Sequence, residues 1–179
     1  MNNVLPRLVD LPQNIKYFLS AFLLLISLGV TLGLVYVYET TEMTADGTEE
    51  HYAGSIPEDN MDIPEKYPKE FESMLLTTHT HLISFSLIFF FLGSIFYMNS
   101  IITGGWKTFI IIEPFFSVLI TFGSIWGVRY ISSIYSNYII LFGILTYLSF
   151  YFMVAVSLYE LLLKKKTDLS QIPREKTVK

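Results

Sequence analysis

Apolar residues gather in four long blocks along the chain, and most charged residues lie between these blocks or near the two ends. The first block is the uncharged stretch from Tyr17 to Tyr38. The others run from about Met74 to Met98, from about Thr108 to Val128 and from about Tyr138 to Leu163. Each block is long enough to cross a hydrocarbon core of about 30 Å as a helix. Because lipid offers backbone groups no other partner, we predict four transmembrane helices.

The connections between the later blocks are short, at residues 99–106 and 131–137. Successive helices should therefore be antiparallel neighbours. The expected fold class is an all-α integral membrane protein, with a four-transmembrane-helix antiparallel bundle over residues 1–163 and a basic cytoplasmic tail over 164–179. The first block is longer than the apolar core of a signal peptide, and no small-residue cleavage pattern follows it, so we expect an uncleaved anchor.

The only sizeable segment between the blocks is residues 39–73. It carries eleven acidic residues against two lysines, Lys66 and Lys69. Its prolines, and the lack of any helical or alternating apolar pattern, predict one acidic irregular outer loop rather than a domain.

The distribution of basic residues predicts the orientation of the chain. Nine of the twelve basic residues lie before the first block, between the second and third, or after the fourth. Lys and Arg favour cytoplasmic loops, so both termini are expected to be cytoplasmic and the acidic loop to lie on the opposite face.

Composition narrows the possible chemistry. Hydrophobic residues make up 52% of the chain and charged residues 16%, which excludes an enzyme with a large water-soluble domain. Cysteine is absent, so disulfides, thiolate metal sites, iron–sulfur clusters and c-type haem attachment are excluded. No phosphate-binding glycine loop, nucleophile elbow or HExxH motif is present, and we assign no catalytic residue.

The three histidines are expected near one face of the membrane. His51 lies in the outer loop, and His79 and His81 lie near the start of the second block. Residues two apart on a regular helix point about 200° from each other, so both can serve one ion only if this segment is extended or distorted. In a regular helix, His81 instead shares its face with Thr77 and Ser84.

These histidines suggest a cofactor site. Imidazoles here could bind the iron of haem b, or a copper or zinc ion, with His51 closing over the site from the loop. The alternative is that the histidines are hydrogen-bonded at the membrane interface and ligate nothing, so that no cofactor is bound.

Two further charged residues lie in or directly after the third block: Glu113 and Arg129. Glu113 should lie about 9 Å into the membrane from Lys107, facing the bundle beside the kink that Pro114 introduces. It could handle protons or bind a cation, or simply form a hydrogen bond; Ser149, Tyr147, Tyr151 and Tyr97 are its candidate partners.

Arg129, at the outer end of the same block, could hold a haem propionate or a lipid phosphate. Alternatively, it anchors the helix end beside Trp126 and Tyr130.

Other features are expected to be architectural. Gly29 and Gly33 form a small-residue face on the first block, for contact with another helix of the bundle or of a second protomer. Glu160 should lie at the inner interface and pair with one of the lysines at 164–166.

Three short runs carry a resemblance to a known group of proteins. They are EHYAG from Glu50 to Gly54, LLTTHTH from Leu75 to His81, and SLYE from Ser157 to Glu160. Together they resemble a group of small uncharacterised bacterial inner-membrane proteins with four predicted helices, over residues 30–163. The resemblance implies a bacterial inner-membrane setting and transfers no catalytic residue or cofactor.

Three functions remain open from the sequence. The first is a membrane protein that binds haem b or a transition metal through His51, His79 and His81, for electron transfer or metal handling. The second is a non-catalytic subunit of a larger membrane complex or a homo-oligomer. The third is a small proton-coupled transporter that uses Glu113. The lipid bilayer is the expected partner in each case, and the basic tail is too short to suggest nucleic acid.

Overall fold

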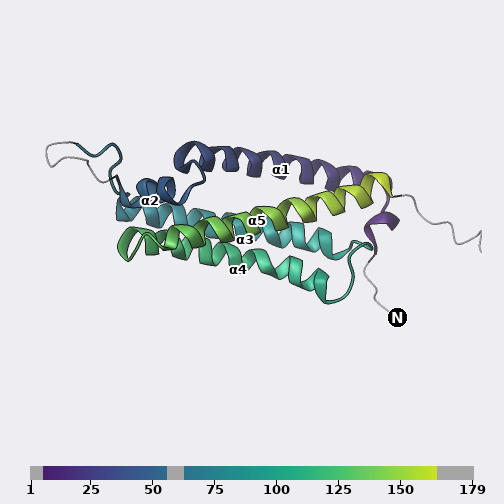
Figure 1. Ribbon diagram of the computed structural model, residues 1–179. Coiled ribbons are helices and arrows are strands. Elements are labelled where there is room, and N and C mark those ends of the chain that lie inside the picture. The colour runs from purple at the N-terminus through teal and green to yellow at the C-terminus, as the bar shows by residue number, and fades with distance from the viewer. Residues whose placement is uncertain (1–5, 56–62, 165–179) are drawn as a thin grey trace, which may run out of the picture.

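The computed structural model describes residues 6–55 and 63–164. Four long helices run side by side: α1 (Gln13–Thr41), α3 (Phe71–Tyr97), α4 (Gly105–Tyr130) and α5 (Tyr135–Leu158) (Figure 1). Each is long and apolar enough to cross a membrane, and α5 continues into a π-helical turn, η2 (Tyr159–Leu163). The predicted all-helical, four-span bundle is confirmed. The middle of the outer segment, at 56–62, and the basic tail from 165 lie outside the described residues.

The expectation of an irregular outer segment is wrong for α2 (Ala45–Ala53), a nine-residue helix at one end of the bundle. Thr44 caps this helix, because its side chain accepts a hydrogen bond from the backbone N–H of Gly47 at 3.0 Å. The hydroxyl of Thr48 donates to the carbonyl of Thr44 at 2.6 Å. Cap bonds of this kind satisfy donors that a helix start otherwise leaves free, and they need no apolar periodicity.

The helices do not pack equally. α4 and α5 have the most extensive contact and α3 packs against both, whereas α1 contacts mainly α2, α5 and η2. Only 17% of the most apolar window of α1 is buried, against 33% for α4. The core between α3, α4 and α5 is rich in phenylalanine, with Phe89, Phe96 and Phe150 fully buried. α1 is therefore the loosely attached helix, with most of its surface left for lipid.

Both ends of the described chain lie at one end of the bundle, opposite α2 (Figure 1). The short helix η1 (Leu8–Asp10) meets the turn after α3, where the N–H of Leu8 donates to the carbonyl of Met98 at 3.1 Å. η1 also packs against η2. This arrangement agrees with an even number of spans that places both termini on one side of the membrane.

Candidate functional site

A groove between α1 and α3 holds one of the three histidines. Its volume is about 270 Å³ and most of its lining is apolar. It is lined by Ile26, Gly29, Val30 and Gly33 of α1 and by Thr80, His81, Ser84, Phe85 and Ile88 of α3. His81 and Ser84 therefore share one face of α3, as the helical spacing predicted. The groove is open because α1 stands away from α3.

The ring of His81 is oriented by its own helix. Its Nδ1 lies 2.8 Å from the carbonyl oxygen of Thr77, one turn earlier. A carbonyl only accepts hydrogen bonds, so Nδ1 carries the proton in this contact and Nε2 of the neutral ring is left as an acceptor. The rings of Phe85 and Phe122 have centroids 6.1 and 5.2 Å from the imidazole. This bond to a carbonyl is the arrangement that commonly orients a metal-ligating histidine.

His79 does not share this groove. The segment that contains both histidines is continuous α-helix, so the extended arrangement that would aim both at one ion does not occur. At two residues of separation, the ring of His79 leaves the helix about 200° from that of His81. His79 is exposed on the outside of α3. The two histidines cannot act together from one helical face.

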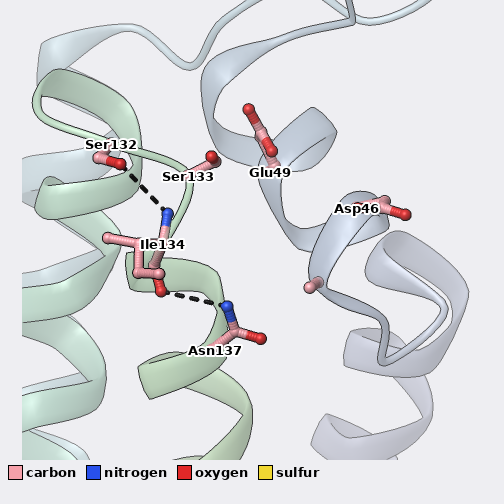
Figure 2. A pocket seen from close by; sticks show the side chains of 7 residues that line it. Asp46, Glu49, Ser132, Ser133, Ile134 and Asn137 are labelled. Atoms are coloured by element: carbon pink, nitrogen blue, oxygen red, sulfur yellow. Dashed lines mark hydrogen bonds between the residues drawn. The ribbon is translucent and has the colours of Figure 1, made fainter.

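The outer end of the bundle also carries a polar pocket between α2 and the turn from α4 to α5 (Figure 2). Its volume is about 300 Å³. Carboxylates from α2 face hydroxyl and amide groups across it; the lining residues are Ala45, Asp46, Glu49, Ser132, Ser133, Ile134 and Asn137. Asn137 already donates to the carbonyl of Ile134 at 3.4 Å. α2 therefore covers only part of this end of the bundle.

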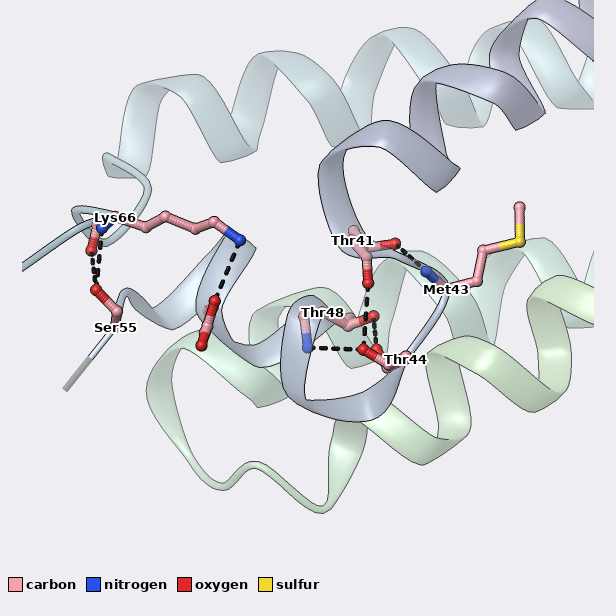
Figure 3. A network of polar contacts seen from close by, with 8 residues as sticks. Thr41, Met43, Thr44, Thr48, Ser55 and Lys66 are labelled. Carbon is pink, nitrogen blue, oxygen red and sulfur yellow. Dashed lines mark hydrogen bonds and ion pairs between the residues drawn. The ribbon is translucent and has the colours of Figure 1, made fainter.

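A polar network holds α2 to the rest of the outer segment (Figure 3). Lys66 forms an ion pair with Glu50 of α2 at 3.1 Å. The backbone N–H of Lys66 donates to the hydroxyl of Ser55 at 3.0 Å. At the other end of α2, the hydroxyl of its cap residue Thr44 donates to the carbonyl of Thr41, the last residue of α1, at 3.4 Å. Side chains thus connect α2 to the end of α1 and to the segment before α3.

His51 belongs to this network rather than to the groove. It lies on α2, with its ring edge-on to Tyr52 at 4.8 Å between centroids. Burial first, and then the positive charges of Lys69 and Lys66, lower its pKa from 6.5 to about 4, while a hydrogen bond to the backbone of Thr40 acts in the opposite direction. His51 is therefore neutral at physiological pH.

Tyr52, the neighbour of His51, is the second side chain of this region whose pKa is shifted. Burial, with smaller effects from Tyr36 and Tyr147, raises its pKa from 10.0 to about 12. His51 and Tyr52 are thus half-buried side chains whose surroundings favour their neutral forms.

Among the described residues, no group of three or more His, Asp or Glu side chains is arranged to hold a metal ion. His51 is on α2, His81 is in the groove between α1 and α3, and His79 is on the outside of α3. The binding of copper or zinc by all three histidines stays a prediction.

Arg129 and Trp126 tie the outer ends of the helices together. Nε of Arg129 donates to the carbonyl of Lys69 at 3.1 Å, and its guanidinium lies 5.0 Å from the centre of the Tyr130 ring. The indole N–H of Trp126 donates to the hydroxyl of Thr78 on α3 at 3.0 Å. These contacts support the anchoring role of Arg129, and the binding of a haem propionate stays a prediction.

Glu113 faces α5, as expected. The hydroxyl of Ser149 on α5 donates to Oε2 of Glu113 at 2.5 Å, and the hydroxyl of Ser117 on α4 donates to Oε1. Ser149 was among the candidate partners, and its contact agrees with the expected hydrogen bond to a hydroxyl of a neighbouring span, whereas the Glu113 side chain is half-buried rather than buried. The tyrosine candidate Tyr151 bonds Thr31 of α1 instead, at 2.7 Å.

The end of the bundle opposite α2 contains a polar site formed by Glu160 with a partner that the sequence did not indicate. Glu160 of η2 is fully buried and accepts hydrogen bonds from both the N–H and the hydroxyl of Ser100. Lys164 donates to the hydroxyl of Ser100 at 2.6 Å and does not reach Glu160 directly. The expected pairing of Glu160 with one of the lysines at 164–166 does not take place directly with Lys164, because Ser100 stands between the two. A pairing with Lys165 or Lys166 would lie outside the described residues.

Comparison with known proteins gives one match. No curated protein and no solved structure matches the chain. Residues 42–168 match the model of a family described as a transmembrane helical domain. This range begins just after α1 and includes α2 and the other three membrane-spanning helices. The match covers well over half of the chain, so the chain belongs to the Aq_1264_TM family of transmembrane helical domains.

Proposed function

We propose that this chain is a multi-pass protein of the bacterial inner membrane that binds haem b in the groove between α1 and α3, where His81 would hold the iron. The observation that carries the proposal is the orientation of His81: Nδ1 bonds the carbonyl of Thr77, which leaves Nε2 as the acceptor in a groove. Neutral imidazole nitrogen is a common axial ligand of haem iron. The haem would supply one-electron chemistry, and the protein would bind and orient it.

The small number of possible protein ligands in the groove favours haem over a copper or zinc ion. A copper or zinc ion takes nearly all of its ligands from the protein, and zinc sites use three or four side chains. A haem iron already has four porphyrin nitrogens, so one imidazole is enough to attach it. Within the described part of the chain, His81 is the only histidine that lines the groove.

The walls of the groove suit a flat apolar ring. A Cβ added at Gly29 or Gly33 would meet nothing within 4 Å, so the α1 wall is recessed at both positions. The opposite wall presents Phe85 and Ile88 of α3. The volume of about 270 Å³ is near the lower end for ligand pockets, but the groove is open to the lipid on one side, so a larger ring can extend beyond it.

Haem reconstitution tests the proposal. The full chain is purified in mild detergent, haemin is added, and the Soret band and the pyridine haemochrome spectrum are measured. Wild-type protein should bind one haem per chain, and His81→Ala should lose the Soret band. His79→Ala is the matched control, because that ring leaves the same helix on the opposite side, and it should bind like wild type.

A second pair of variants tests the position of the haem. Gly33→Ala places a small methyl group in open space and should keep most of the binding, whereas Gly33→Phe should fill the groove and abolish it. Wild-type protein that binds no stoichiometric haem, or a His81→Ala variant with an unchanged spectrum, would refute the proposal. The groove could then receive a helix of a partner protein instead. The chain would in that case be a non-catalytic subunit of a larger membrane complex.

A further inference from the structure

A carboxyl group with two hydroxyl partners lies inside the membrane-spanning part of the chain, away from the groove. Glu113 is eight residues from the start of α4 at Gly105, or about 12 Å along the helix. Both of its carboxyl oxygens are hydrogen-bonded, one to Ser117 and one to Ser149 of α5. We propose that these three residues form a proton-binding site within the membrane, in which the Glu113 carboxyl holds one proton that exchanges with water. The site is independent of haem binding.

No cationic side chain balances a negative charge on Glu113. It forms no ion pair with any Lys, Arg or His of the described residues. On α5, the nearest titratable residues are Tyr147 and Tyr151, each two positions from Ser149 and so about 160° round the helix from it. Tyr151 bonds Thr31 on α1.

The titratable residues of α3 lie towards the ends of that helix. Glu72, His79 and His81 are in its outer half, and Tyr97 is its last residue. The carbonyl of Tyr97 accepts a hydrogen bond from Lys107 at 3.1 Å. A carboxylate in the hydrocarbon region that lacks a cation is costly, and a bound proton removes that cost.

The number of available oxygen atoms favours a proton over a metal cation. The site offers the carboxyl group and two hydroxyls. Pro114 has no N–H, so the carbonyl of Ile110, four residues earlier, loses its helical donor and adds one more acceptor. Calcium and magnesium take about six or more oxygen ligands. A single proton needs only one carboxyl oxygen and one acceptor.

The two serines can accommodate both protonation states. A hydroxyl is one donor and an acceptor. When Glu113 is ionised, both hydroxyls can donate to it, one to each carboxyl oxygen. When Glu113 is protonated, it donates to one serine, whose own hydroxyl can turn to the carbonyl four residues earlier. Several hydroxyls among the described residues make such bonds within their own helices, for example Ser27, Ser94 and Thr146.

Infrared spectroscopy tests the proposal directly. The full chain is reconstituted in phosphatidylcholine vesicles, and absorption is measured in the region of the protonated carboxyl stretch at neutral pH in H₂O and in D₂O. Wild-type protein should show such a band, shifted in D₂O because the proton exchanges. Glu113→Gln should remove the band, while Glu72→Gln, at the outer start of α3, should keep it.

A third variant connects the band to the serine contact. Ser149→Ala should keep the band at a changed frequency, because the carboxyl loses one hydrogen bond. The amide I band of the same samples reports whether each variant is folded as a helical bundle. A wild-type spectrum without a protonated carboxyl band, a band that survives Glu113→Gln, or a band that appears only when sodium is removed would overturn the proposal.

Discussion

Glu160 accepts two hydrogen bonds from Ser100, one from the backbone N–H at 2.7 Å and one from the hydroxyl at 2.6 Å. The two residues are 60 positions apart, and their contact joins the π-helical end of α5 to the turn between α3 and α4. Lys164 bonds the same hydroxyl, so positive charge lies one hydrogen bond away from the buried carboxylate. The inner end of the bundle is thus closed by a polar network in which each partner is satisfied.

We expect Glu160→Ala to destabilise the protein strongly. The substitution removes a fully buried acceptor and leaves the N–H and hydroxyl of half-buried Ser100 without it, and an unsatisfied buried group costs about 1–3 kcal/mol. The melting temperature in detergent should therefore fall by several degrees. Glu65→Ala, at an exposed position of the outer segment, is the control and should leave the melting temperature nearly unchanged. Equal melting temperatures for the two variants would show that the network contributes little.

The contact between Glu160 and Ser100 could not be predicted from the sequence, whereas other features of the fold could. The four spans could be predicted because the requirement for apolar length is local to each helix. The hydroxyl partner of Glu113 could be placed among a few candidates because the fourth span was expected to run antiparallel beside the third, although depth in the membrane favoured Tyr97 over Ser149. Ser100 carries no comparable signal: it lies in a short turn, and only the packing of η2 against that turn brings it to Glu160. α2 was missed because a cap and tertiary contacts stabilise it rather than apolar periodicity.

The docking of α2 should depend on Gly47. A Cβ at this position would overlap the backbone carbonyl of Thr41, so Gly47→Ala must push α2 away from the end of α1. Hydrogen exchange of the α2 amides should become faster in this variant, while exchange in α4 and α5 stays slow. Gly143→Ala is the matched control, because a Cβ there meets nothing within 4 Å. Unchanged protection of α2 in Gly47→Ala would contradict the close contact.

Acid should loosen α2 through His51. Its pKa is lowered from 6.5 to about 4 in the folded protein, so folding favours the neutral ring. The stability that this preference contributes is fully present above about pH 6.5 and is lost as the pH falls towards 4. Proteolysis or hydrogen exchange of the segment around α2 should therefore increase over this range.

Acid can also act on other groups of the outer segment, so a comparison is needed to isolate His51. His51→Gln cannot take up the proton, and its exchange rates should depend less on pH than those of wild type between pH 6.5 and 4. Parallel pH profiles for the two proteins would show that carboxylates, rather than His51, account for any acid-induced loosening.

The orientation of the bundle can be tested with reporter fusions. The structure places both ends of the described chain at one end of the bundle and α2 at the other, so a single measurement at each end determines the topology. The positive-inside rule predicts that the end with η1, Lys107 and Lys164 faces the cytoplasm. Alkaline phosphatase, active only outside the cytoplasm, should be active when fused after Asn60 and inactive when fused after Lys166, and a cytoplasmic reporter should give the opposite pattern. Phosphatase activity after Lys166 would mean that the bundle has the opposite orientation. The His81 groove would then lie in the cytoplasmic half of the membrane, and an electron acceptor would have to approach it from the cytoplasm.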